Sequence, residues 1–501
     1  MTNKYYLTTP IYYVNDKPHI GHAYTTILAD VLARFHRGQK DPADVFFLTG
    51  LDEHGQKVQQ AAEKRRLSPQ AHCDDLAPRF SDLWKKLEIH YTDFIRTTQA
   101  RHRAVVQTVL ADIHKKGLIY ESQYEGWYSV AEERFITETD LQSGAFRDVK
   151  KIKEKNYFFK MSRYQQDLIK HIEDHPDFIQ PAHRRNEILG FLRQPLGDLC
   201  ISRPKSRMSW GIELPFDKNY VTYVWFDALL NYVTGPGYLD DEAAFKKWWP
   251  ADVHLIGKDI LTTHAVYWPT MLMAMNVDLP KTIFAHGWWL TGQAKMSKSL
   301  GNIVDPLDLI DKFGVDPVRF FLMKEMVLGQ DANFTVDLFI KCYNSNLAND
   351  FGNLLNRVSG LIGKHFDSVV PESVNDFCGD AEKEIQNWIK QDRLEDHINH
   401  FRVNEAIDMI MTLVQKANAY MEKQAPWKVA KTDLKRAGVI LYTATEALRM
   451  SAVLLNPVMP QKTSEVLDIL GAAGSGPAWG GLTPGTKLKV HGALFPRIEE
   501  S

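Results

Sequence analysis

The first 115 residues alternate short apolar runs with amphipathic segments. The runs at 5–13, 45–48 and 93–97 have the length and side chains of strands, and the apolar positions of residues 22–37 repeat with the period of a helix. Alternating strands and helices are typical of a parallel sheet covered by helices. We therefore predict that residues 1–115 form the first half of a doubly wound (Rossmann-type) α/β domain.

The pattern changes between residues 116 and 222, where aromatic-rich runs predict shorter strands and turns. The α/β pattern then resumes, so residues 116–222 are predicted to be a connective module inserted between two half-sheets. Because such sheets bind ligands at the carboxyl ends of their strands, both halves are expected to line one crevice. The second half is expected at 223–293, with an apolar-aromatic run at 223–228, strands at 253–256 and 282–285, and an apolar helix that ends at Met275.

Residues 294–340 begin with a short polar loop at 295–302 and lead into a region where helical periodicity dominates. This pattern predicts that residues 341–501 form a C-terminal α-helical bundle. A Gly- and Pro-rich stretch at 471–485 interrupts the pattern, and residues 488–495 are predicted to form a final strand. The predicted helical segments are 338–365, 379–399, 401–422, 432–456 and 460–469.

Composition limits the class of protein. The 60 Lys plus Arg nearly balance the 62 Asp plus Glu, so any nucleic acid must be held by local basic surfaces. The four cysteines are far apart and form no Cys-x-x-Cys pair, which favours a reducing compartment. No basic-then-apolar leader and no apolar stretch approaching ~20 residues is evident, so we expect a cytoplasmic protein without a membrane partner.

The His-Ile-Gly-His string at 19–22 lies between the first predicted strand and the first predicted helix. A helix N-terminus offers unpaired N–H donors and the positive end of a dipole, and Gly21 permits a close approach to the backbone. The string therefore predicts a phosphate site. Taken alone, an ordinary turn with two solvated histidines explains it equally well.

A second cationic string, Lys-Met-Ser-Lys-Ser at 295–299, follows the second half-sheet. In this order and on these elements, the two strings resemble the paired signatures of class I aminoacyl-tRNA synthetases. The resemblance narrows to the methionyl-tRNA synthetase family and covers residues 1 to about 500. Its further strings lie at 10–13, 50–55, 224–228, 257–260 and 424–427.

The resemblance implies that L-methionine is activated with ATP and Mg²⁺ to methionyl-adenylate and pyrophosphate, and then transferred to the 3′ end of tRNA(Met). Such catalysis aligns two anions and stabilises charge on phosphate oxygens, without a covalent nucleophile. The implied catalytic residues are His19, His22, Lys295 and Lys298. The implied ATP-binding residues are His19, Gly21, His22, Gly257, Asp259, Trp289 and Lys298.

The resemblance assigns methionine to seven residues. Asp52 would bind the ammonium group and aromatic walls would receive the soft thioether. From the pattern alone, Trp225 and Tyr232 would be core residues, because they are seven residues apart on one helix face. His264 would be a buried histidine whose hydrogen bonds are satisfied within the core. The implied residues are Ile11, Tyr13, Asp52, Trp225, Tyr232, Ile260 and His264.

In the bundle, Asn353, Arg357 and Trp427 match the family's anticodon-reading positions. Single-stranded bases are recognised by stacking and by hydrogen bonds to their edges. Five cations near Trp427 would meet the phosphates, although such residues more often form a solvated face, and Trp427 itself could cap a helix. These cations are Lys423, Lys428, Lys431, Lys435 and Arg436.

One departure from the family concerns zinc. Where many relatives carry Cys-x-x-Cys knuckles, residues 129–132 read Ser-Val-Ala-Glu. We therefore expect no structural zinc, with packing of Trp127, Tyr128 and Phe135 in its place. The chain also lacks the dimerising module that some relatives append, so we expect a monomer.

Rival interpretations are disfavoured by specific features. A cysteine enzyme of the same class would need zinc ligands, and the enzymes for leucine, isoleucine and valine usually carry a longer insertion than 116–222. A small nucleotidyltransferase with a similar turn would not explain the helices after residue 340. A non-enzymatic RNA-binding module would not need both lysines of the 295–299 loop.

Overall fold

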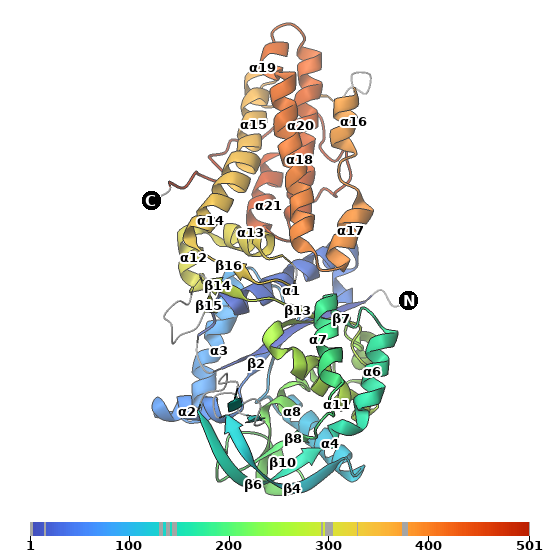
Figure 1. Cartoon of the computed structure of the whole chain (residues 1–501). Coiled ribbons are helices and arrows are strands. Elements are labelled where there is room, and N and C mark those ends of the chain that lie inside the picture. Colours follow the sequence, from blue (N-terminus) through green and yellow to red (C-terminus); the bar gives the residue numbers. More distant parts are fainter. Residues whose placement is uncertain are drawn as a thin grey trace. The chain divides into compact units, whose positions relative to one another are not determined.

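The computed structural model forms two compact units (Figure 1). The first comprises Met1–Pro18, His36–Lys85 and His90–His286, and the second comprises His19–Phe35, Lys86–Ile89 and Gly287–Ser501. The residues described are 4–14, 17–129, 134–136, 141–142, 148–291, 294–295, 304–327, 329–372 and 379–499.

A six-stranded sheet is the centre of the first unit, in the order β3-β2-β1-β12-β13-β7. All of its strand pairs are parallel, and β2 is buried along its whole length, as expected for a sheet covered on both faces. The chain adds β2 and β3 on one side of β1 and β12 and β13 on the other. The switch point therefore lies between β1 and β12. The strands are β1 (Tyr5–Tyr13), β2 (Val45–Asp52), β3 (Asp93–Arg96), β7 (Ile179–Gln180), β12 (Val253–Gly257) and β13 (Ile283–His286).

The helices of this unit bury apolar faces against the sheet. In α4 (Ala100–Lys115), buried residues recur at three- and four-residue spacings from His102 to Ile113, which defines one face. The 223–228 run forms a short helix, α8 (Val224–Ala228). The predicted apolar helix through Met275 is a π-helical turn, Thr263–Tyr267, followed by α11 (Trp268–Met275). The others are α2 (Gln56–Lys64), α3 (Pro69–Lys86), α9 (Asn231–Thr234) and α10 (Glu242–Trp248).

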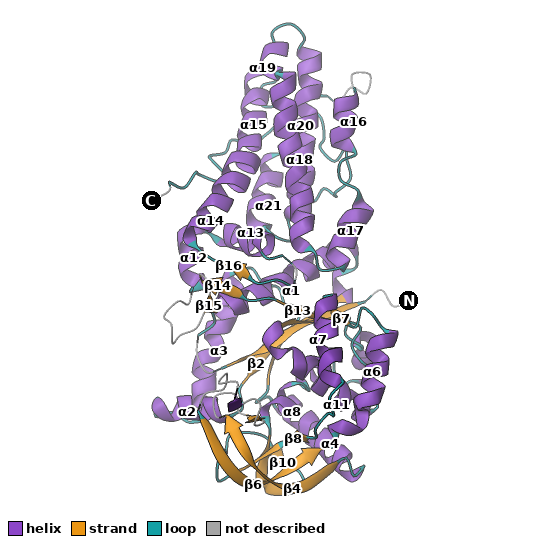
Figure 2. Ribbon diagram, in the orientation of Figure 1, coloured by secondary structure: helices purple, strands orange, loops and turns teal. Residues whose placement is uncertain are grey.

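The inserted segment differs from the shorter strands and turns predicted for it (Figure 2), because its strands β4 (Ile119–Ser129) and β6 (Val149–Phe159) have 11 residues each. It also contributes two helices, α6 (Gln165–Asp174) and α7 (Ala182–Leu192), and strand β7, which joins the central sheet beside β13. Its own two sheets have the strand orders β5-β4-β6-β8 and β10-β11-β9. Their strands are β4 (Ile119–Ser129), β5 (Arg134–Ile136), β6 (Val149–Phe159), β8 (Leu199–Cys200), β9 (Ser202–Pro204), β10 (Glu213–Leu214) and β11 (Asp217–Thr222).

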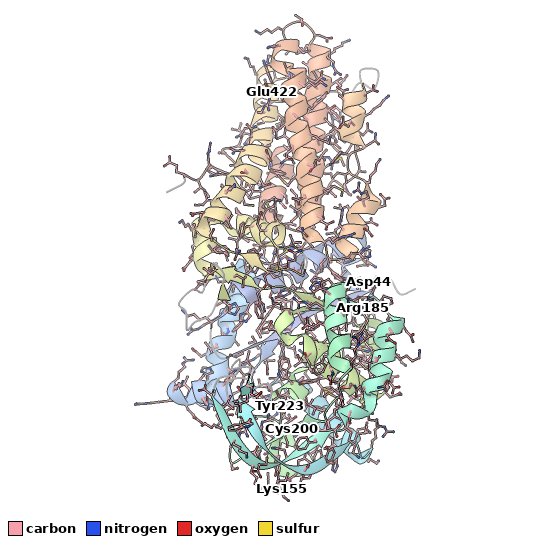
Figure 3. The ribbon with its side chains drawn as sticks, in the orientation of Figure 1. Asp44, Lys155, Arg185, Cys200, Tyr223 and Glu422 are labelled. Atoms are coloured by element: carbon pink, nitrogen blue, oxygen red, sulfur yellow. The ribbon has the colours of Figure 1, made fainter. Side chains whose placement is uncertain are left out.

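Arginine and aromatic side chains hold the base of the insertion together. The guanidinium of Arg203 lies 4.5 Å from the ring centroid of Tyr223 and 5.4 Å from that of Tyr128, and Arg207 lies 4.1 Å from the Tyr128 ring. Arg203 also donates to Cys200, and Figure 3 shows Tyr223 and Cys200 on neighbouring segments. These stacks give Tyr128 the packing role expected for it. The Phe135 side chain lies outside the described residues.

The second unit is mainly helical, with a small sheet of β14 (Trp289–Thr291), β15 (Ala294–Lys295) and β16 (Ala332–Asn333). The segment 379–399 forms two helices, not one. Residues 488–495 form no regular strand, and the adjoining residues bond to the bundle instead, where Asn344 exchanges two hydrogen bonds with Ile498. The helices are α12 (Pro306–Phe313), α13 (Val315–Glu325), α14 (Val336–Cys342), a π-helix (Tyr343–Gly352), α15 (Asn353–His365), α16 (Asp380–Gln386), α17 (Gln391–Asn399), α18 (Val403–Gln424), α19 (Pro426–Val429), α20 (Leu434–Leu455) and α21 (Pro460–Ile469).

Most of α1 (Ile20–Gln39) belongs to the second unit although it follows β1 in the chain. An ion pair between Asp30 and Arg319, 2.7 Å long and fully buried, joins α1 to α13. Arg319 also donates to the carbonyls of Val458 and Leu87. These hydrogen bonds satisfy a buried charge, and they attach α1 to the bundle side of the molecule.

Helix α20 is long and apolar enough to cross a membrane by length and composition, contrary to the expectation that no stretch would be. Of its most apolar window, 89% is buried inside the protein. It also contains a buried ion pair between Glu446 and Arg449, 2.7 Å long. Burial of this kind is typical of the core helix of a bundle, and Figure 1 shows α20 running alongside α15 and α18.

Candidate active site

The N-terminus of α1 brings His19 and His22 together. Their rings stack with centroids 3.8 Å apart. The Nδ1 atom of His22 accepts the backbone N–H of His19 at 3.3 Å, and Nδ1 of His19 accepts the N–H of Gly21 at 3.1 Å. In a neutral imidazole whose Nδ1 accepts, Nε2 carries the hydrogen. Both rings are thereby set as Nε2–H donors at a helix N-terminus, the arrangement that suits an anion.

Asp52 lies at the carboxyl edge of the central sheet. The prediction placed it in a loop after the second strand, but β2 continues to Asp52, which pairs with Tyr13, while Ile11 pairs with Gly50. The Asp52 residue is 8% exposed. Gly55 follows with φ 120°, a conformation that favours glycine, and a Cβ there would collide with the Tyr13 hydroxyl. The edge beside the switch point therefore holds Ile11, Tyr13 and Asp52.

Tyr232 and His264 form a buried hydrogen-bonded pair. The Nδ1–H of His264 donates to the Ile260 carbonyl at 2.9 Å, so Nε2 accepts from the Tyr232 hydroxyl at 2.7 Å. The partly exposed Trp225 ring meets His264 edge to face with centroids 6.0 Å apart. His264 is carried by a π-helical turn, a feature frequent at functional sites. Four of the implied methionine residues are thus joined, although the satisfied ring of His264 also fits a core histidine.

Burial keeps His264 neutral. Desolvation lowers its pKa from 6.5 to about 4. The unfolded chain therefore binds a proton between these values that the folded chain does not, and His264 reduces stability as the pH falls through this window. Burial also raises the pKa of Tyr232, so its hydroxyl keeps its proton.

The lowered pKa of His264 predicts a dependence of stability on pH, which the variant His264→Gln should lack. Between pH 7 and pH 5 the free energy of unfolding of the parent protein should fall by about 2 kcal/mol more than that of His264→Gln. Urea unfolding at both pH values measures the difference. The other buried histidines contribute equally to both proteins, and equal pH dependences would show that His264 is not held neutral by the fold.

The residues implied for ATP belong to both compact units. Gly257 ends β12 and Asp259 is exposed in the next turn, where its Oδ1 lies 2.6 Å from the position of a Cβ at 257. In the second unit, the Trp289 ring packs against Phe321 and Tyr24 with centroids 5.7 and 6.0 Å away. The ring of Trp289 is therefore part of that core, which leaves its backbone for the role that the resemblance implies.

The lysines of the 295–299 string are described only in part. Lys295 pairs with Leu290 through the backbone of β15, but its side chain and all of Lys298 lie outside the described residues. The predicted meeting of the 19–22 and 295–298 clusters over one triphosphate therefore stays a prediction.

Three buried residues near the sheet edge were not singled out from the sequence. The carboxylate of Asp227 bonds to His54 at 2.6 Å and to His102 at 2.7 Å. Burial opposes the charge on Asp227, but the two histidines outweigh it and lower its pKa to about 2. The sequence feature that could have indicated this network is the acidic residue Asp227 inside the apolar run at 223–230, because a buried carboxylate needs buried hydrogen-bond partners.

The three candidate anticodon residues gather where α15, α18 and α19 meet in the second unit (Figure 1). The guanidinium of Arg357 lies 5.7 Å from the Trp427 ring and bonds Glu422 of α18 at 3.0 Å; Figure 3 shows Glu422 near the end of that helix. Asn353 donates to Asn418 at 3.3 Å. Asn353 is exposed and Trp427 is half-buried, so a stacking surface is available to bases.

The basic residues around Trp427 divide into two kinds. Arg436 bonds the buried carboxylate of Glu382 at 2.6 Å, so part of its guanidinium has a structural task, and its contact with phosphates stays a prediction. The exposed members of the set are Lys423, Lys428, Lys431 and Lys435.

Within the part of the chain that the structure describes, no group of three or more His, Cys, Asp or Glu residues is arranged to hold a metal ion. Of residues 129–132, which stand where many relatives carry the zinc knuckle, residues 130–132 lie outside that part. The expectation of a zinc-free insertion is untested and stays a prediction.

Comparison with known proteins extends these findings. The chain matches the family described as tRNA synthetases class I (M) over residues 5–145 and 146–359. Residues 370–501 match the anticodon binding domain of methionyl tRNA ligase. Methionine–tRNA ligase of Clostridium acetobutylicum is 46% identical over 99% of this chain and 78% of the relative. That of Rickettsia felis is 42% identical over 100% of this chain and 99% of the relative.

A solved structure supports the same family. Mycobacterium tuberculosis methionyl-tRNA synthetase in complex with methionyl-adenylate superposes with a TM-score of 0.93 at 39% identity, covering 99% of this chain and 100% of that chain. The expected fold class, an α/β parallel-sheet domain with a helical anticodon domain, is confirmed. The chain therefore belongs to the methionine–tRNA ligase family of class I aminoacyl-tRNA synthetases and joins methionine to tRNA.

Proposed function

We propose that this chain performs its two-step reaction with the residues described above. In the first step the methionine carboxylate attacks the α-phosphorus of ATP, the bond to pyrophosphate breaks, and methionyl-adenylate forms. In the second step the terminal ribose hydroxyl of tRNA(Met) attacks the activated carbonyl and AMP leaves. Mg²⁺ is expected to enter with the triphosphate, whose oxygens suit it.

Methionine is assigned to the carboxyl edge of the first unit. The observation that carries this assignment is the parallel register that places Tyr13 beside Asp52, next to the switch point of the sheet. Asp52 offers a charged partner for the ammonium group, and Ile11 offers a backbone group. Trp225, Ile260 and the Tyr232–His264 pair supply an apolar and aromatic wall with few polar atoms, which suits a thioether.

The triphosphate is assigned to the Nε2–H groups of His19 and His22, with Gly21 at the helix N-terminus. Lys295 and Lys298 are proposed to bind its β,γ end. Gly257 and Asp259 are proposed for the ribose, and the backbone near Trp289 for adenine. The catalytic task of these groups is to stabilise charge on phosphate oxygens.

The experiment that tests the assignment of methionine is ATP–pyrophosphate exchange, measured separately with each amino acid. Exchange should depend on methionine, and homocysteine should be the strongest competitor, because one methyl group gives only ~10–200-fold selectivity. Exchange supported by leucine or cysteine but not by methionine would contradict the proposal.

Trp427→Ala is expected to separate the two steps. Stacking of one base on an aromatic ring contributes about 1–3 kcal/mol, so kcat/KM for aminoacylation of tRNA(Met) should fall by about 5- to 150-fold. ATP–pyrophosphate exchange should stay within twofold, because Trp427 contacts neither ATP nor methionine in this assignment. Trp388→Ala in the same bundle is the control, since Trp388 donates to the Met409 carbonyl and has no assigned base. Equal losses of exchange and aminoacylation would contradict an anticodon role.

The proposal also covers the oligomeric state, the localisation and the zinc content of the protein. We expect a monomer in the cytoplasm, and the cysteine usage supports the reducing compartment. We also expect the insertion to fold without zinc, because Tyr128 is already packed between Arg203 and Arg207.

A further inference from the structure

Asp227 carries a fully buried carboxylate that receives hydrogen bonds from two elements other than its own. Its Oδ2 meets Nδ1 of His54 at 2.6 Å, and its Oδ1 meets Nε2 of His102 at 2.7 Å. An ionised carboxylate only accepts hydrogen bonds, so both facing nitrogens must be N–H donors. The tautomer and the orientation of each ring are therefore set by Asp227.

The two hydrogen bonds lead to different places in the fold. His54 stands two residues after Asp52 at the end of β2, and Asp227 stands two residues after Trp225 in α8. The bond between His54 and Asp227 therefore links two parts of the proposed methionine site. One is the strand end that carries Asp52, which is assigned to the ammonium group, and the other is the helix that carries Trp225, which is assigned to the side chain. His102 lies on α4, which holds no residue assigned to methionine, and its link to the site is the longer contact, 3.3 Å, with the hydroxyl of Thr234 at the end of α9, the helix of Tyr232.

The end of β2 is also fixed from other directions. The indole N–H of Trp210 donates to the Glu53 carbonyl at 2.5 Å, and the Glu53 carboxylate bonds Arg96 at 2.6 Å. These contacts tie residue 53 to the insertion and to β3. The bond from His54 to Asp227 ties this strand end to α8.

We propose that Asp227 is a positioning residue for methionine binding, which acts through His54 to fix the separation of Asp52 and Trp225. The inference rests on the proposed assignment of those two residues to methionine. Asp227 itself does not touch the substrate. A displacement of about 1 Å between groups that bind one ligand can cost about 10²-fold, so a loosened strand end should weaken methionine binding without affecting ATP.

The test uses variants that differ only in the N–H groups offered to Asp227. His54→Leu removes the donor, whereas His54→Asn keeps an amide N–H near the position of Nδ1. His102→Leu is the matched control, since it removes the other buried donor from the same carboxylate. KM for methionine and KM for ATP are measured by ATP–pyrophosphate exchange, and the melting temperature is measured in parallel.

His54→Leu and Asp227→Ala should each raise KM for methionine about tenfold with KM for ATP within twofold. His54→Asn should restore KM for methionine to within about threefold of the parent. The double variant Asp227→Ala/His54→Leu should have the same KM for methionine as His54→Leu, because each change removes the hydrogen bond between residues 54 and 227. His102→Leu should lower the melting temperature but leave KM for methionine within twofold.

Equal changes in KM for methionine in His54→Leu and His102→Leu would overturn the proposal, as would a KM that is unchanged in all folded variants. Asp52→Asn separates this inference from the function assigned to the site. If Asp52→Asn raises KM for methionine and the Asp227 and His54 variants do not, only the positioning role fails; if Asp52→Asn has no effect, the assignment of the site fails as well.

Discussion

Asp52→Asn should raise KM for methionine by about 30-fold or more in ATP–pyrophosphate exchange, because removing one partner of a largely buried charge pair costs about 2–5 kcal/mol. Asparagine has nearly the same shape, and the backbone of residue 52 keeps its bond from the Val14 N–H at 3.0 Å. The strand should therefore persist while the charge is lost. KM for ATP should change little.

The control for this variant is Asp252→Asn. Asp252 precedes β12 at the opposite, amino-terminal edge of the same sheet, where it pairs with Lys281 at 2.6 Å and accepts the Tyr6 N–H at 2.7 Å. Its loss should lower stability and leave KM for methionine within twofold. An Asp52→Asn protein that binds methionine normally would show that the ammonium group is bound elsewhere.

The sheet edge could be predicted from the sequence because its signals are local. An apolar run at 45–48 followed by polar residues places Asp52 at a strand end, and a strand that is four residues longer leaves it at the same edge. Strand β7 could not be found in this way. It has only two residues, Ile179 and Gln180, and its place beside β13 depends on pairing across about a hundred residues of chain.

The sequence did not show that most of α1 belongs to the second unit, or that Asp227 bonds two buried histidines. The reason differs from that for β7. Asp30 and Arg319 are polar residues in helical patterns that read as surface positions, and only their meeting across 289 residues makes burial favourable. The same holds for Asp227 and His54, which are 173 residues apart. Periodicity shows which face of an element is buried, whereas a buried charge reveals its partner only in three dimensions.

The histidines of α1 allow the contribution of one donor to be measured. His22→Ala removes an Nε2–H aimed from a helix N-terminus, and the loss of one such donor to developing negative charge typically lowers kcat by about 10²–10³. Pyrophosphate exchange at saturating methionine and ATP measures this loss. The melting temperature should change little, since the ring of His22 is partly exposed and stacks on the neighbouring ring of His19.

Two conservative variants identify the nitrogen that matters. His22→Gln places an amide N–H near the position of Nε2, and His22→Asn places one near the position of Nδ1. In the parent protein, Nδ1 of His22 accepts the His19 N–H. If Nε2–H contacts the phosphates, the glutamine variant should retain at least tenfold more activity than the asparagine variant. Thr26→Ala, which removes a hydroxyl bonded to the His22 carbonyl at 2.9 Å, is the control and should be within threefold of the parent. Higher activity in the asparagine variant would assign the donor to Nδ1, and would require the first turn of α1 to rearrange when ATP binds.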